Sequence, residues 1–147
     1  MSQPPAVAVL AGSKSDQAVV DEAVKALAEL GVPHDARVIS AHRNPEGLRE
    51  YVAGSSASVF IAIAGLSAHL PGVIASMTTK PVIGVPVAVK LAGLDSLLSI
   101  AQMPPGVPVA TVGVDNARNA GILAAEILAL SDDQLAGRIR KMREAWR

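Results

Sequence analysis

Three short polar loops carry most of the residues in this sequence that could do chemistry. They are GSKSD (12–16), SAHR (40–43) and GLSAHLPG (65–72). The third loop is the most unusual, because it places a lone histidine, His69, among otherwise apolar residues. An imidazole titrates near neutral pH, so burying it is costly unless it has a partner. His69 is therefore a candidate proton-transfer group, a candidate metal ligand or a packed core histidine.

The first loop has the composition of a phosphate-binding turn. Ser13, Ser15 and the backbone amides precede a predicted helix, and helix N-termini bind anions well. Asp16 could accept hydrogen bonds from ribose hydroxyls. In the alternative interpretation a serine caps the helix and Asp16 complements its dipole, and for the pentapeptide alone this is favoured. The loop has neither the nucleotide-triphosphate signature nor the dinucleotide fingerprint.

The second loop supplies Arg43, which can hold a phosphate or a carboxylate through two parallel hydrogen bonds, with His42 beside it. The alternative is an exposed arginine next to a solvated histidine. That alternative weakens if this loop faces the serine loop.

Metal binding and nucleophilic catalysis are both disfavoured by the residue pattern. The histidines His34, His42 and His69 have no cysteine or suitably spaced carboxylate that would complete a tetrahedral site. No G-x-S-x-G motif is present. Acid–base chemistry is the role left for His69. Lys80, Lys90 and the arginines of the C-terminal tail are interpreted as solvated surface charge.

Apolar segments alternate with helical patterns along the chain, and these elements must position the three loops. We expect strands at 6–11, 34–39, 58–64, 80–87 and 107–112. We expect helices at about 17–30, from Asn44 and Pro45 onward, near Pro71, and at 95–101 and 116–130. This alternation predicts an α/β fold: a three-layer, flavodoxin-like open parallel sheet with helices on both faces.

Ligands of such sheets bind beyond the carboxyl ends of the strands, where the strand order reverses. If the first strand lies between the second and the third, all three polar loops meet at that point. This coincidence is the strongest indication of a functional site that the residues alone provide.

The C-terminal tail has a different pattern. Ser131 and Gln134 have the spacing of a capping box, which predicts a helix start. Leu135, Ile139, Met142 and Trp146 then form a narrow apolar stripe on a charged helix. The helix either lies on its own domain or packs on a neighbouring subunit. We expect residues 1–130 to form the catalytic domain and 131–147 a C-terminal helix of that domain, which we assign to oligomer formation.

Composition limits the class of protein. The 147 residues suit one domain, and half are hydrophobic but only 2% aromatic, which favours a core of aliphatic side chains. Zero net charge argues against nucleic acid as a partner. The absence of cysteine excludes disulfides, and no leader or membrane-span pattern is seen, so we expect a cytoplasmic protein. Zero charge with positive mean hydropathy indicates a homo-oligomer with covered apolar surface.

Six motifs together resemble one known family. They are GSKSD, SAHR, AHLPG, GVPV, GLDSLLSIAQMPPGVPVAT and NAGILAAEIL, and they occur here in the order seen in the PurE family. That family comprises the N5-carboxyaminoimidazole ribonucleotide mutases of purine biosynthesis. The resemblance covers Ala6 to about Leu130. It implies a flavodoxin-like fold, a homo-octamer, and a reaction without metal, ATP or an organic cofactor.

The resemblance also implies roles for individual residues. Ser13, Ser15 and Arg43 would hold the 5′-phosphate of the substrate, and Asp16 its ribose. His69 would be the general acid and base. Ser40, Ala41 and His42 would line the carboxylate side of the pocket, with His42 as a second catalytic residue. The remaining residues assigned to substrate binding are Gly65, Ser67 and Leu70.

In the implied reaction, His69 protonates the carbamate nitrogen and releases carbon dioxide inside the pocket. The ring carbon then attacks this carbon dioxide intermediate, and neutral His69 removes the ring proton. Apolar walls such as Leu70 would keep water out.

The sequence departs from the family pattern in one loop. Many bacterial mutases read GGAAHLPG where this chain has Leu66 and Ser67. The related aminoimidazole ribonucleotide carboxylases use a Gly-Arg-Ser-Asn type loop and free carbon dioxide, so direct carboxylation is the nearest competing hypothesis. Two further hypotheses are a non-catalytic ribonucleotide-phosphate binding module and a purely structural oligomer.

Overall fold

The computed structural model describes residues 3–147, which form a five-stranded parallel sheet flanked by helices. The strands are β1 (Val7–Ala11), β2 (His34–Val38), β3 (Val59–Gly65), β4 (Val82–Val87) and β5 (Ala110–Thr111). The helices are α1 (Gln17–Glu29), α2 (Pro45–Gly54), α3 (Leu70–Met77), α4 (Leu94–Ala101), α5 (Ala117–Ala129) and α6 (Asp133–Glu144), with single 3-10 turns η1 (Lys14–Asp16) and η2 (Leu91–Gly93).

The strand order is β2-β1-β3-β4-β5, so β1 lies between β2 and β3, the arrangement that a meeting of the three loops requires. Val7 of β1 pairs with His34 on one side and with Val59 on the other, and all pairings are parallel. The carboxyl ends of these three strands therefore lie at one edge of the sheet.

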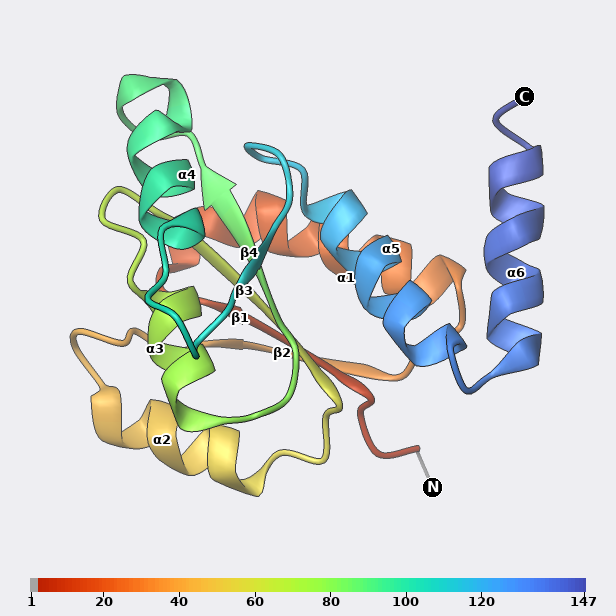
Figure 1. Cartoon of the computed structure of the whole chain (residues 1–147), viewed down its shortest axis with the longest axis horizontal. Coiled ribbons are helices and arrows are strands. Elements are labelled where there is room, and N and C mark those ends of the chain that lie inside the picture. The colour runs from red at the N-terminus through yellow and green to blue at the C-terminus, as the bar shows by residue number, and fades with distance from the viewer. Residues whose placement is uncertain (1–2) are drawn as a thin grey trace.

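The sheet separates two apolar layers. Figure 1 shows the helices that cover them on either side of the sheet. Alternate strand residues such as Val9 and Ile61 pack under α1, α5 and α6. Their neighbours, such as Leu10 and Phe60, pack under α2, α3 and α4. This alternation is the period-two pattern of strands covered on both faces, and it confirms the predicted three-layer fold.

Local signals explain where the helices begin and how closely they pack. The Asn44 side chain accepts a hydrogen bond from the Gly47 amide, and Pro45 occupies the first turn of α2. On α5, a Cβ added to Gly121 would lie 3.0 Å from the Ala23 carbonyl oxygen of α1. Small residues on α5 therefore permit its close approach to α1.

Two sequence expectations about element ends are wrong. The strand expected at 107–112 is reduced to Ala110–Thr111 at the sheet edge. The capping box at Ser131 does not form, because Asp132 is the N-cap of α6 and its carboxylate accepts from the Leu135 amide at 3.0 Å. A carboxylate at this position also interacts favourably with the helix dipole.

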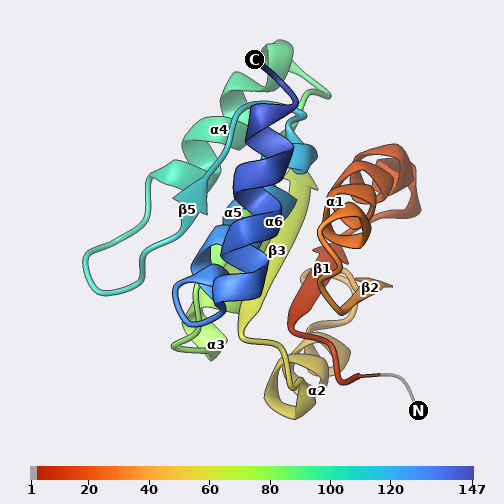
Figure 2. The ribbon, with the colours of Figure 1, turned by 90° about the vertical axis from the view of Figure 1, so that its right-hand side faces the viewer.

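Helix α6 runs alongside α5 (Figure 2). Leu135 and Ile139 are buried in the same core layer as α1 and α5, whereas Trp146 is 71% exposed. The first half of the apolar stripe is therefore covered by the chain's own domain, and the last turn presents its tryptophan to the surface. Arg143 also forms an ion pair with Glu126 of α5.

Two basic side chains that were expected to be solvated instead cap helix ends. The Lys80 ammonium donates to the carbonyl oxygens of Ser55 and Ala57, just after α2. Arg138 of α6 donates from Nε to the Leu30 carbonyl oxygen at the end of α1, at 2.9 Å. Cations are favourable at helix C-termini, where carbonyl groups lack helical partners.

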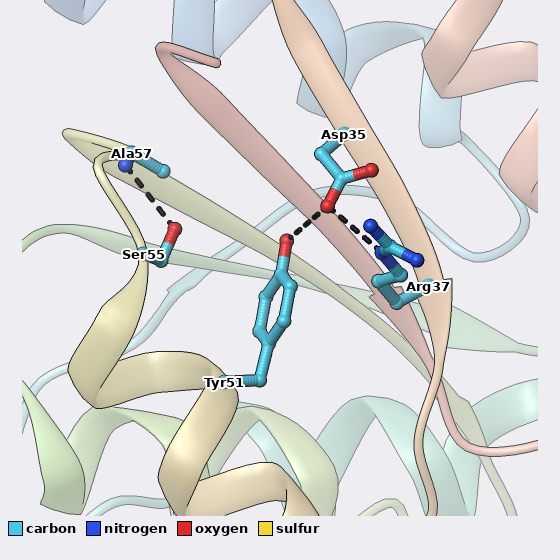
Figure 3. Close-up of polar contacts among 5 residues, drawn as sticks. All are labelled: Asp35, Arg37, Tyr51, Ser55 and Ala57. Carbon is cyan, nitrogen blue, oxygen red and sulfur yellow. Dashed lines mark hydrogen bonds and ion pairs between the residues drawn. The ribbon is translucent and has the colours of Figure 1, made fainter. Parts of the chain in front are cut away.

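A polar cluster ties α2 to the edge strand β2 (Figure 3). Oδ2 of Asp35 accepts from the Tyr51 hydroxyl and from Arg37 Nε, each at 2.9 Å. Burial and the neighbouring carboxylate raise the pKa of Tyr51 to about 12. Burial opposes ionisation of Asp35, but the two donors outweigh it and lower its pKa. The cluster therefore helps to hold α2, whose first turn follows the SAHR loop.

Within residues 3–147, no helix is both long enough and apolar enough to cross a membrane.

Candidate functional site

The three polar loops converge on one pocket at the carboxyl ends of β1, β2 and β3. The pocket has a volume of about 350 Å³. Every residue assigned to the site from the sequence lines it: Ser13, Ser15, Asp16, Ser40, Ala41, His42, Arg43, Gly65, Ser67, His69 and Leu70. The spatial grouping follows from the strand order, because each loop directly follows one of three adjacent strands.

The serine loop is held by its own hydroxyls. Ser13 caps the turn η1 by accepting from the Ser15 amide at 3.3 Å, and the two hydroxyl oxygens lie 2.9 Å apart. The capping interpretation is therefore correct for Ser13. It does not exclude phosphate binding, since both hydroxyls also line the pocket.

Asp16 is the one buried carboxylate of this pocket, with 9% of its surface exposed. Desolvation by burial raises its pKa. Although Asp16 stands at the N-cap of α1, its side chain makes no capping hydrogen bond to that helix in the described structure. A carboxylate held in a desolvated position without a capping role is suited to accept hydrogen bonds from a bound ligand.

The SAHR loop turns sharply into α2. The Ser40 hydroxyl accepts from the Arg43 amide at 3.2 Å, and the Ser40 carbonyl oxygen accepts from the Asn44 amide at 2.9 Å. These bonds close a turn that leaves the Arg43 side chain exposed at the mouth of the pocket.

The two histidines of the pocket contact each other directly. Nε2 of His42 lies 2.7 Å from Nδ1 of His69, and the rings meet edge to face with centroids 4.8 Å apart. Such a bond needs one protonated and one unprotonated nitrogen, so it also selects a tautomer for each ring. The sequence placed both histidines in one pocket but did not predict their pairing.

His69 is exposed in the isolated chain, which corrects the expectation of a histidine in largely apolar surroundings. Leu70, the apolar residue that follows His69, is buried and does not enclose the exposed imidazole, although it also lines the pocket. His69 therefore incurs little desolvation cost in the single chain, and its side-chain partner in the pocket is His42.

The loop before His69 has an unusual backbone. Leu66 and Ala68 have φ values of 56° and 42°, in the left-handed region that favours glycine. Each such residue costs about 1–3 kcal/mol and persists only where its surroundings enforce it. At Gly65 the backbone passes close to Val89, and an added Cβ would lie 2.8 Å from Cγ2 of that valine, so the position favours glycine. The bacterial mutase pattern has glycine where this chain has Leu66. The left-handed φ of Leu66 explains why glycine suits this position.

Five residues that line the pocket were not assigned from the sequence: Gly12, Ala64, Leu66, Ala68 and Val89. Gly12, Leu66 and Ala68 lie within the polar loops, and Ala64 immediately precedes the third loop. Val89 comes from the segment after β4, two residues beyond the GVPV motif, and as an apolar side chain it carried no chemical signal of a site. The described histidines and carboxylates do not gather into a group of three or more that could hold a metal ion.

Leu66→Gly is predicted to stabilise the protein by about 0.5–1 kcal/mol. Relief of the left-handed leucine contributes about 1–2 kcal/mol, and the added freedom of the unfolded chain removes part of this gain. Leu66 is 49% exposed, so removing its side chain costs little burial. Chemical denaturation at fixed protein concentration measures the change. Ser67→Gly is the matched control: its φ is not left-handed, so we expect a loss of stability. Equal losses of stability in Leu66→Gly and Ser67→Gly would contradict the backbone strain assigned to Leu66.

Asp16→Asn is predicted to stabilise the fold at pH 7 while weakening ligand binding. Because burial raises the pKa of Asp16, the native state retains this proton at pH values where the unfolded chain has lost it. The wild type therefore gains stability as pH falls through that window, and the advantage of the variant disappears near the ordinary carboxyl pKa of about 3.9. Urea titrations from pH 7 to 4 measure this. Asp21→Asn on the exposed side of α1 is the control, and a pH-independent advantage at position 16 would refute the prediction.

Comparison with known proteins identifies the family. A family model described as AIR carboxylase matches residues 6–147. The N5-carboxyaminoimidazole ribonucleotide mutase of Methanocaldococcus jannaschii is 59% identical over 94% of this chain and 88% of that protein. A protein of the same name from Mycobacterium leprae is 53% identical over 95% and 84%. The crystal structure of Treponema denticola PurE superposes with a TM-score of 0.86 at 32% identity, covering 96% of this chain and 90% of that one. The chain therefore belongs to the AIR carboxylase family, which is the PurE family that its six motifs resemble.

Proposed function

We propose that this protein is an N5-carboxyaminoimidazole ribonucleotide mutase of purine biosynthesis. It moves the carboxylate from the exocyclic nitrogen of its substrate to the ring carbon, giving 4-carboxy-5-aminoimidazole ribonucleotide. The observation that carries the proposal is the His42–His69 hydrogen bond in a pocket that also holds two serine hydroxyls, an arginine and a buried carboxylate. Relatives that are 51–59% identical over at least 92% of the chain and carry the mutase name support it.

The pocket offers a separate group for each part of a ribonucleotide. Ser13, Ser15 and Arg43 bind the 5′-phosphate, since hydroxyls, turn amides and a guanidinium are the donors that phosphate prefers. Asp16 binds the ribose hydroxyls. The imidazole and its carboxylate then lie toward the histidine pair, among the remaining lining residues Ser40, Ala41, Gly65, Ser67 and Leu70.

His69 transfers the proton. As an imidazolium it protonates the carbamate nitrogen, and the nitrogen–carbon bond breaks to give carbon dioxide and aminoimidazole ribonucleotide. The ring carbon attacks the retained carbon dioxide, and neutral His69 then takes the proton from that carbon, restoring aromaticity. One group gives and regains one proton, so the cycle closes without a second acid.

His42 orients His69 and sets its tautomer. Neutral His42 accepts from Nδ1 of His69 through its Nε2, the two atoms being 2.7 Å apart. Nε2 of His69 is then the nitrogen that exchanges its proton with the substrate. Protonating both rings would place two N–H groups against each other, so the pair favours one proton at this contact.

We propose further that the protein acts as a cytoplasmic homo-octamer. Large apolar side chains are exposed beside the pocket and on α4, including Val89, Leu94 and Leu98. Neighbouring subunits would cover them and exclude water from a site that is open in the single chain. The C-terminal segment 131–147, whose Trp146 is exposed, is the part of the domain that we assign to contact with a neighbour.

The substrate distinguishes the mutase from the direct carboxylase that the family description names. Purified protein is mixed either with the N5-carboxylated compound at low carbon dioxide or with aminoimidazole ribonucleotide and bicarbonate. We expect efficient product formation in the first mixture. Efficient turnover in the second mixture alone would identify a carboxylase, and turnover in neither would leave a binding protein.

His69→Asn is predicted to lower kcat by at least about 100-fold, because the proton-transfer group is lost. The substrate Kd should change little, since the phosphate and ribose groups are intact. Calorimetric titration and initial rates measure the two effects. His34→Asn is the control, because His34 begins β2 at the opposite end from the pocket and bonds the Val32 carbonyl oxygen. A fully active His69→Asn variant would eliminate the proton-transfer role.

A further inference from the structure

Ser99 of α4 makes a hydrogen bond to the loop that carries His69. Its hydroxyl donates to the carbonyl oxygen of Ser67, two residues before the histidine. Ser99 lies outside the set of residues that line the main pocket. The bond joins the crossover helix after β4 to the loop after β3, on the face of the sheet where α3 and α4 lie (Figure 1).

The Ser67 carbonyl is at the most constrained point of this loop. It belongs to the peptide between Ser67 and Ala68, with the left-handed Leu66 on one side and the left-handed Ala68 on the other. Neither position is glycine, so this conformation persists only if its surroundings enforce it. Within the loop, the Ala68 amide donates to the Gly65 carbonyl oxygen at 2.9 Å. The Ser99 bond ties the backbone of the loop to α4, whereas the His42 bond reaches the loop only at the His69 side chain.

A second cavity explains why a tie is needed on this side. It has a volume of about 260 Å³ and lies against the loop, lined by Ala68, His69, Gly72, Val73, Ser76 and Ser99. His69 lines both this cavity and the main pocket, so it forms part of the wall between them. The open space leaves room for the Ser67–Ala68 peptide to move toward α4, although the Ala68 side chain is buried, and the hydroxyl of Ser99 fixes that peptide.

From this geometry we propose that Ser99 is a positioning residue for His69. By fixing the Ser67–Ala68 peptide, it holds the His69 ring at hydrogen-bond distance from His42 and keeps Nε2 of His69 toward the substrate. This inference rests on the proposed function for its kinetic test and on the histidine contact alone for its spectroscopic test. Loss of the hydroxyl lets the loop relax into the second cavity and displaces the ring.

The kinetic test uses Ser99→Ala, with Ser99→Thr to restore a hydroxyl and Ser76→Ala as the matched control. Ser76 lines the same cavity, but its hydroxyl bonds within its own helix, to the Val73 carbonyl oxygen. We expect Ser99→Ala to lower kcat by about 10-fold or more with little change in KM, since small displacements of a reacting group are costly. Ser99→Thr should recover most of the rate, and Ser76→Ala should match wild type. An unchanged kcat in Ser99→Ala would overturn the proposal, as would equal changes in kcat and KM.

The spectroscopic test does not depend on turnover. The chain has three histidines, so nitrogen-15 labelling of histidine alone gives one ring signal pair each for His34, His42 and His69. Ser99→Ala should shift the signals of His42 and His69 and leave those of His34 unchanged. Unshifted His69 signals in a folded variant would overturn the proposal even if activity fell. A wild type without turnover would refute the proposed function and leave this test standing. If Ser99→Ala does not fold, Ser99→Cys, which is of similar size and a weaker donor, takes its place.

Discussion

The position of β1 between β2 and β3 is the constraint on which the rest of the site depends. Parallel pairing on both sides of β1 brings three carboxyl ends to one edge of the sheet, and the loops that follow them have nowhere else to meet. The residues of β1 and β3 are buried between two helical layers, so a one-residue slip in register would move every side chain of the strand into the opposite core layer. The stability of the scaffold and the geometry of the pocket therefore have the same origin.

Above this rigid base the pocket is built from strained and polar parts. Leu66 and Ala68 adopt left-handed backbone angles, Asp16 is a carboxylate in a desolvated position, and His42 and His69 share one hydrogen bond. The left-handed residues and the desolvated carboxylate cost free energy in the empty protein, whereas the histidine hydrogen bond is favourable. Surrounding elements compensate: the hydroxyl of Ser99 fixes the loop, and the Tyr51–Asp35 contact supports α2 behind the SAHR turn.

Sequence reasoning located the elements and the pocket because their signals are local. The apolar runs of the strands, the Asn44 cap before Pro45 and the three polar loops are each recognisable from a few consecutive residues. A strand order assumed from the fold class then joined them. The features it missed depend on contacts between distant segments. The capping of helix ends by Lys80 and Arg138, the shortening of β5 and the pairing of His42 with His69 leave no local pattern. Leu66 is the exception, because the sequence already showed leucine where many bacterial mutases have glycine. The left-handed φ of Leu66 now explains why glycine suits this position.

The central claim is that the three loops form one ribonucleotide site with its reacting atoms at His69. A crystal structure of the His69→Asn variant with the N5-carboxylated substrate tests this most directly, because the variant holds the substrate unreacted. We expect the phosphate on Ser13, Ser15 and Arg43, the ribose on Asp16, and the carbamate nitrogen at about 2.6–3.2 Å from the side chain at position 69. A substrate bound with its imidazole away from position 69, or bound outside the pocket, would contradict the claim.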